Sequence, residues 1–181
     1  MGVGCLIVKT EFAEKLRPLH FGGEMVDAVK ITELERGIVP YFSKIPERLE
    51  GGTLPVGGII GLKVALNKLM SMDLIIINQT IAQLVQKSQL ELSKYPRVRI
   101  LAANGAILCF NIDGVHPHDV AQILADDRIS VRAGFMWAQP FLEYKDWGPV
   151  VRASFSLFNN FDDVDRLVKS VSSVSQKMGL S

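Results

Sequence analysis

The chain has 181 residues, of which 48% are hydrophobic, and its 20 basic and 19 acidic side chains leave a formal net charge of +1. A chain of this length can bury a sizeable core, and the balanced charge removes the electrostatic reason to expect a nucleic acid or an anionic membrane as partner. No stretch reaches the roughly 20 uninterrupted apolar residues of a membrane-spanning helix, and the apolar run near the N-terminus is too short for a secretory signal. We therefore expect a cytoplasmic protein.

The N-terminal third of the sequence carries few strong secondary-structure signals. Residues 3–8, VGCLIV, are typical of a buried strand. The turn formers Gly22-Gly23 open a stretch without clear periodicity, which we expect to be irregular up to about residue 50. The loop EGGTLPVGG at 50–58 follows, and its glycines, threonine and proline favour turns.

Two long helices are expected next. The first covers 57–71, and its apolar residues fall on more than one face, which favours a helix buried on most sides. The second covers 73–94 and is ended by Pro96. A large apolar surface in a short chain also indicates an interface with another polypeptide.

The strongest local signal is a hairpin within 97–112, where Asn104-Gly105 separates two apolar runs and both residues tolerate a positive φ. A short helix is expected from His116 onward, because Pro117 stands where a missing N–H has no cost. The run ISVR at 129–132 indicates the next strand.

The C-terminal part ends in a strand at 150–157 and a helix capped by Asn159 or Asn160, with Asp162 and Asp163 in its first turn. From about residue 97 the order is therefore strand, strand, helix, strand, strand, helix. This order predicts an α+β unit with a small antiparallel or mixed sheet and helices on one face.

One loop and one histidine pair have residue types that can bind ligands. His116 and His118 are two residues apart and lack further ligands apart from Asp119, so we expect no metal site. The loop Gly51-Gly52-Thr53 precedes an apolar helix, and such a loop either binds a phosphate or simply forms a turn and cap.

Arg132 and Arg152 lie in apolar strand-like runs, where an unpaired guanidinium group would be costly to bury. Either each arginine forms a structural salt bridge, or it binds the carboxylate of a ligand. Cys5 and Cys109 lack CxxC spacing and are expected to be buried, unreactive thiols.

A family resemblance emerges from motifs that occur in one order along the chain. They are FGGEMV at 21–26, EGGT at 50–53, GGIIGL at 57–62, HPHDV at 116–120, VRAG at 131–134, RASF at 152–155 and DVDRLV at 163–168. Together they resemble the C-terminal half of Suf-type cysteine desulfurases, which are class V aminotransferase-fold enzymes related to selenocysteine lyase. The resemblance runs from about residue 2 to residue 175.

The resemblance implies a two-domain pyridoxal phosphate fold that works as a homodimer. In that family a lysine holds the cofactor and takes the substrate proton, and a cysteine on a mobile loop accepts the sulfur as a persulfide. An arginine late in the chain binds the substrate carboxylate, and a Gly-Thr pair contacts the cofactor phosphate of the partner subunit. The cofactor supplies the electron sink.

Carried over residue by residue, the resemblance assigns the carboxylate-binding role to Arg152 and the start of the cysteine loop to Arg132. Gly52 and Thr53 correspond to the phosphate-binding pair. Trp137 stands at the position of the sulfur-accepting cysteine, and an indole cannot form a thiolate or a persulfide. The cofactor-binding lysine would precede Met1.

We therefore expect a truncated desulfurase-like chain without a catalytic residue of its own, unable alone to bind the cofactor stably or to transfer sulfur from cysteine. Residues 1–55 would be a remnant of the large domain, 56–96 linking helices and 97–181 the small domain. Two alternatives remain: one half of a two-chain pyridoxal phosphate enzyme, or a regulatory binding partner of a full-length desulfurase or a sulfur carrier. A homodimer or a separate chain would supply the large domain.

Overall fold

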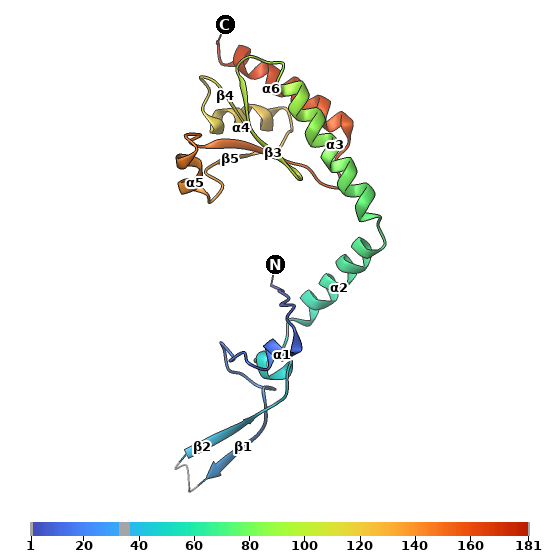
Figure 1. The fold of residues 1–181 in the computed structure, drawn as a ribbon, viewed down its shortest axis with the longest axis vertical. Coiled ribbons are helices and arrows are strands. Elements are labelled where there is room, and N and C mark those ends of the chain that lie inside the picture. Colours follow the sequence, from blue (N-terminus) through green and yellow to red (C-terminus); the bar gives the residue numbers. More distant parts are fainter. Residues whose placement is uncertain (1, 33–36, 181) are drawn as a thin grey trace. The chain divides into compact units, whose positions relative to one another are not determined.

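A computed structural model of the chain describes residues 2–32 and 37–180. The chain divides into two compact units, unit 1 (Met1–Ser71) and unit 2 (Met72–Ser181), and Figure 1 labels the elements of both. Each unit combines helices with one small antiparallel sheet, which confirms the α+β prediction. Within the described residues, no helix is long and apolar enough to cross a membrane.

Unit 1 contains a two-stranded antiparallel sheet that the sequence did not predict. Strands β1 (Val26–Thr32) and β2 (Gly37–Phe42) pair in the region expected to be irregular, with Ile31 opposite Ile38. The expected strand at 3–8 is wrong: this segment forms no ladder, and Leu6 and Ile7 are exposed. An apolar run becomes a strand only where another strand satisfies its backbone groups, and the strands of unit 1 pair with each other instead.

The remaining elements of unit 1 are helical. They are α1 (Thr10–Ala13), a short 3₁₀ turn (Glu47–Leu49) and α2 (Val56–Met70). The extent of α2 confirms the predicted helix to within one residue, but the expected burial is wrong, because no residue of α2 is buried. Most apolar residues of α2 are exposed, among them Ile60, Val64 and Met70.

Unit 2 begins with α3 (Leu74–Leu92), which confirms the second predicted helix. Asp73 caps its N-terminus, where the carboxylate oxygen Oδ1 accepts hydrogen bonds from the amides of Ile75 and Ile76 at 3.0 and 3.1 Å. Leu84, Val85 and Leu92 form the buried stripe of this helix.

The sheet of unit 2 has four strands in the order β3-β4-β6-β5, all antiparallel: β3 (Val98–Asn104), β4 (Ile107–Ile112), β5 (Arg132–Gly134) and β6 (Val150–Ser154). The predicted β3–β4 hairpin is confirmed, although its two turn residues are Gly105 and Ala106, one position later than expected. Gly105 supplies the positive φ of 56°. The run at 129–132 joins the sheet only from Arg132, so the predicted strand is displaced towards the C-terminus.

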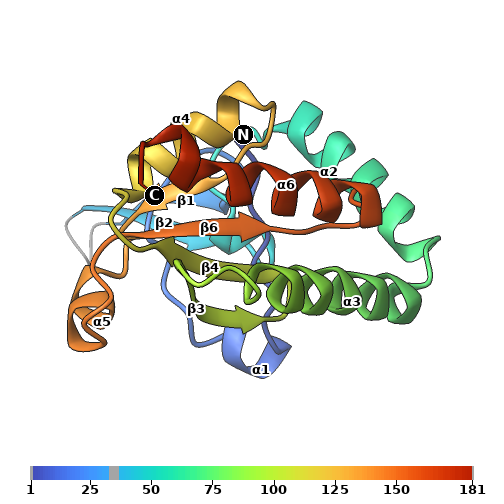
Figure 2. The ribbon, with the colours of Figure 1, turned by 90° about the horizontal axis from the view of Figure 1, so that it is seen from above.

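Three helices, α3, α4 (Pro117–Asp126) and α6 (Phe161–Lys177), pack on one face of this sheet, as expected (Figure 2). Strand side chains alternate between faces, and Leu108, Phe110, Val151 and Ala153 turn towards the helices and are buried. A short helix, α5 (Gln139–Tyr144), lies between β5 and β6 in the sequence. Asn160 caps α6 and forms a reciprocal capping box with Asp163.

Candidate functional site: the arginine face of the unit 2 sheet

The second face of the unit 2 sheet brings together both arginines that the sequence singled out. In the register of the sheet, Cys109 on β4 lies opposite Arg152 on β6, and Arg152 lies opposite Arg132 on β5. Directly opposite residues of antiparallel strands point to the same face. The three side chains therefore form a row across the sheet, on the face opposite to α3, α4 and α6.

The environment of Arg152 suits an anionic ligand. Its Nε atom is shielded from solvent and has no hydrogen-bond partner in the described part of the chain. A shielded donor without a partner costs free energy, about 1–3 kcal/mol, and a carboxylate bound in the planar fork of the guanidinium group would remove that cost. The exposed Arg132 adds a second positive charge beside it.

Cys109 is the thiol in this row. It is partly buried, which corrects the expectation of a fully buried thiol, and burial raises its pKa, while the positive charge of Arg152 opposes that shift. The net direction keeps the thiol protonated and weakly nucleophilic at neutral pH. Cys5 is exposed, so the expectation that it would be buried is wrong.

Asn111 holds the start of β6 in place and was not predicted from the sequence. Its amide Nδ2 donates to the carbonyls of Pro149 at 3.0 Å and Trp147 at 3.4 Å, and its Oδ1 accepts from the amide of Val151 at 3.3 Å. These bonds fix the backbone immediately before Arg152. The only sequence signal was an asparagine inside an apolar strand.

The loop after Arg132 has an unusual backbone. Gly134 has a φ of 122°, and the consecutive residues Met136 and Trp137 have φ values of 53° and 58°, which side chains other than glycine rarely adopt. The indole of Trp137 is 96% exposed. Together with Arg132, this loop lines a hollow of about 380 Å³.

The two histidines near this loop lie at the start of α4, where His116 is the N-cap residue. The Nδ1 atom of His116 accepts from the amide of His118 at 3.3 Å, and the two rings stack with centroids 5.4 Å apart. Among the described residues no cluster of three metal-ligating side chains occurs.

Gly52 and Thr53 belong to unit 1, where two glycine turns touch. The Gly52 amide donates to the carbonyl of Gly23 at 2.9 Å, and a Cβ at Gly22 would lie 2.8 Å from the Gly52 nitrogen. This close approach explains why both turns are glycine-rich. The Gly52 amide is therefore already engaged, while the neighbouring Thr53 is exposed.

Comparison with known proteins adds a consistent set of relatives. The sequence pattern of the family Aminotransferase class-V matches residues 1–167. A probable cysteine desulfurase of Halalkalibacterium halodurans is 35% identical over 98% of this chain, which corresponds to 43% of that protein.

Two solved structures extend the comparison to the fold. The cysteine desulfurase CsdA of Escherichia coli gives a TM-score of 0.83 at 32% identity, over 93% of this chain and 41% of that one. The apo cysteine desulfurase of Thermococcus onnurineus NA1 gives 0.82 at 28% identity, over 92% and 41%. The chain thus spans about two fifths of the length of these relatives.

Proposed function

Because the chain belongs to the class V aminotransferase family and is cysteine desulfurase-like, we propose that it binds an amino-acid carboxylate but does not itself transfer sulfur. The proposed carboxylate binding rests on one observation, the environment of Arg152. Its shielded Nε has no hydrogen-bond partner among the described residues, and its neighbour across the strands is another arginine. Two adjacent cations on one face of a sheet are stabilised by an anion between them.

The family depends on pyridoxal phosphate, which when bound supplies an electron sink for a carbanion at the substrate Cα. In this proposal Arg152 binds the substrate carboxylate and Arg132 adds positive charge at the same face. Thr53 is exposed beside a turn of small residues, so its hydroxyl could donate to a phosphate of the cofactor. The amide of Gly52 already donates to Gly23, so Gly52 would contribute only the space that its missing side chain leaves for the phosphate.

Trp137 supports the second half of the proposal. It stands at the position of the family's sulfur-accepting cysteine, and its indole offers no nucleophile for the substrate sulfur. Cys109 is a poor substitute, since its raised pKa keeps it protonated and β4 fixes it in the sheet. The chain therefore holds the substrate-binding charge without the sulfur acceptor.

A chimeric protein tests both halves together. In it, this chain replaces the matching 43% of the Halalkalibacterium halodurans relative. We expect the chimera to bind pyridoxal phosphate and cysteine but to release almost no sulfide, and Trp137→Cys to restore sulfide release. Arg152→Gln should remove cysteine binding, whereas Arg99→Gln, on the outer strand β3, is the matched control and should leave it.

Either of two results would contradict the proposal. A chimera with Trp137 that releases sulfide as fast as the relative would show that another residue accepts the sulfur. Unchanged cysteine affinity after Arg152→Gln would show that this arginine does not bind the carboxylate.

A second candidate function is one half of a two-chain enzyme. It is favoured by the arginine pair, which would bind the carboxylate of a substrate whose reacting atoms are held by a second polypeptide. Such a complex would carry out lyase or transamination chemistry that needs no cysteine. Purifying the chain with any associated polypeptide and measuring its pyridoxal phosphate content distinguishes this candidate: cofactor in a two-protein complex supports it, and cofactor-free chain alone contradicts it.

A further inference from the structure

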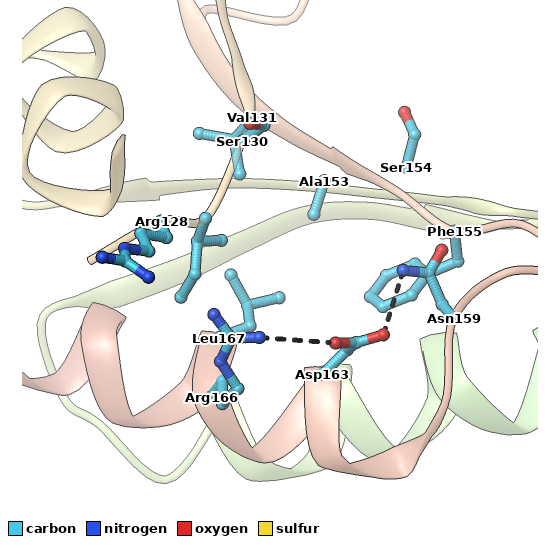
Figure 3. Close-up of a pocket in the computed structure, with 11 residues that line it drawn as sticks. Arg128, Ser130, Val131, Ala153, Ser154, Phe155, Asn159, Asp163, Arg166 and Leu167 are labelled. Carbon is cyan, nitrogen blue, oxygen red and sulfur yellow. Dashed lines mark hydrogen bonds and ion pairs between the residues drawn. The ribbon is translucent and has the colours of Figure 1, made fainter. Parts of the chain in front are cut away.

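A separate cavity opens in unit 2 where strands β5 and β6 part. The ladder between them ends at the pair Arg132–Arg152, and no backbone hydrogen bond within the described part of the chain joins 129–131 to 153–155. The gap forms a cavity of about 230 Å³, between this split edge and α6 (Figure 3). Ile129, Val131, Ala153 and Leu167 give it an apolar wall.

Two arginines stand at the same end of this cavity. Figure 3 shows Arg128, from the turn after α4, and Arg166, from α6, at one end, with Asn159 at the other. Arg166 lies 3.8 Å from the carboxylate of Asp163, a contact too long for a hydrogen bond. Within the described residues no hydrogen bond or ion pair holds the guanidinium group of Arg128, whose side chain is exposed, although its backbone amide donates to the carbonyl of Ala125 at 2.9 Å.

Among the described residues that line the cavity, one carboxylate occurs, that of Asp163, and it already accepts hydrogen bonds. Asp163 accepts from the side-chain amide of Asn159 at 3.3 Å and from the backbone amide of Asn160 at 3.2 Å, in addition to its contact with Arg166. It also lies in the first turn of α6, where the helix dipole stabilises a negative charge. The charge left at the arginine end of the cavity is therefore positive.

The backbone of Arg128 gives an independent indication. Its φ is 61°, at the position directly after the C-cap of α4, where glycine is the preferred residue because it lacks a Cβ. An arginine there costs conformational energy, and inside unit 2 no described contact of its guanidinium group offsets that cost. Strain retained beside a cavity is a reason to look for a ligand.

From this geometry we propose that the cavity binds a short branched aliphatic carboxylate, whose carboxylate pairs with Arg128 and Arg166 and whose carbon tail packs against Ile129, Val131 and Leu167. The apolar wall selects against strongly hydrated ions, and the two guanidinium groups select against amines. This site is distinct from the Arg132–Arg152 row on the other face of the sheet, and it does not rest on the proposed function.

Isovalerate is a suitable probe, and isoamylamine, which has the same tail with an amine, is its matched control. Isothermal titration or chemical-shift mapping on the full chain should show saturable isovalerate binding that perturbs Ile129, Val131 and Leu167, with no binding of the amine. Acetate and inorganic phosphate should bind more weakly, because neither fills the apolar wall. Arg166→Gln should weaken isovalerate binding about tenfold or more.

Arg128→Gly separates ligand binding from folding. Glycine relieves the strain, so the variant should melt at a higher temperature than the parent chain while losing isovalerate affinity by about tenfold or more. Asp146→Gly is the matched control, because Asp146 has a similar φ of 54° and lies outside the cavity, so it should melt higher and bind isovalerate normally. Absence of saturable binding to the parent chain, or equal affinity of parent and Arg128→Gly, would overturn the proposal.

Discussion

Trp137 combines near-complete exposure with a left-handed backbone, so its side chain contributes little to folding. We expect Trp137→Cys to change the free energy of unfolding by no more than about 0.5 kcal/mol. The new thiol should react with iodoacetamide much faster than Cys109, whose pKa is raised by burial. Peptide mass spectrometry of alkylated protein measures both rates, and equal rates for the two thiols would contradict this account of the loop.

Asp127 links the turn after α4 to α6 through charge. Its carboxylate accepts from the Ser170 hydroxyl at 2.6 Å and from Lys177 at 2.9 Å, and both interactions, the serine bond first, hold the pKa of Asp127 below its ordinary value. A carboxyl group with a depressed folded-state pKa stabilises the fold above its unfolded pKa of about 3.9, and loses that effect as the pH falls through the lower folded value.

The expected result is a melting difference between the parent chain and Asp127→Asn that is present at pH 6 and shrinks as the pH falls below about 4. Asp126→Asn is the control, because Asp126 accepts only from the neutral amide of Gln122, at 3.2 Å, among its described contacts. A difference that stayed constant down to low pH would show that the carboxylate charge plays no part.

At the scale of elements, α6 depends on its N-cap. The side chain of Asn160 accepts from the amides of Asp162 at 2.9 Å and Asp163 at 3.1 Å. Asn160→Ala should lower the free energy of unfolding by about 1 kcal/mol, whereas Asn78→Ala, on the exposed side of α3, should not lower it. Urea denaturation of both variants measures this, and similar losses for the two would exclude a capping effect.

Helices were predicted well from the sequence because their signals are local. Periodicity, Pro117 and the asparagine before α6 place α2, α3, α4 and α6 within a few residues of their observed bounds. Strands were predicted less well, since a strand also needs a partner. The hairpin β1–β2 was missed, and the run at 129–131 leaves the sheet although it reads as a strand.

The candidate site could be predicted only in part, because it too depends on contacts between residues that are distant in the sequence. Arg132 and Arg152 were singled out one at a time, as residues in apolar runs. They lie directly opposite each other because of the register between β5 and β6. Local sequence patterns do not determine the register of two residues that are 20 positions apart in the sequence. The hydrogen bonds of Asn111 to the start of β6 also depend on contacts between distant residues, and so does the cavity beside Arg128. Neither feature is predicted from the sequence.

At the scale of the whole chain, the two units differ in how they are stabilised. Unit 2 buries a continuous core built from its sheet and three helices, whereas in unit 1 only Ala13 and Met25 are buried among the described residues. We expect limited proteolysis to degrade unit 1 first and to leave a resistant fragment that begins near Met72. Mass spectrometry of the digest identifies it, and a resistant fragment from unit 1 would contradict this expectation.

The exposed apolar surface of α2 also affects how unit 1 behaves in solution. With residues such as Ile60, Val64 and Met70 exposed, unit 1 should bind a hydrophobic dye or associate with another polypeptide. Gel filtration with dye binding measures this, and a monomer without dye binding would show that these side chains are covered in solution.

The most direct test of the central claim is an assay for sulfide released from free cysteine by the purified 181-residue chain, with pyridoxal phosphate added and no second protein present. Because the proposed function assigns no sulfur acceptor to the chain and position 137 carries an indole, the chain should release sulfide at the rate of a blank that contains the cofactor alone. Release above that blank in proportion to protein concentration, over several turnovers, would contradict the account.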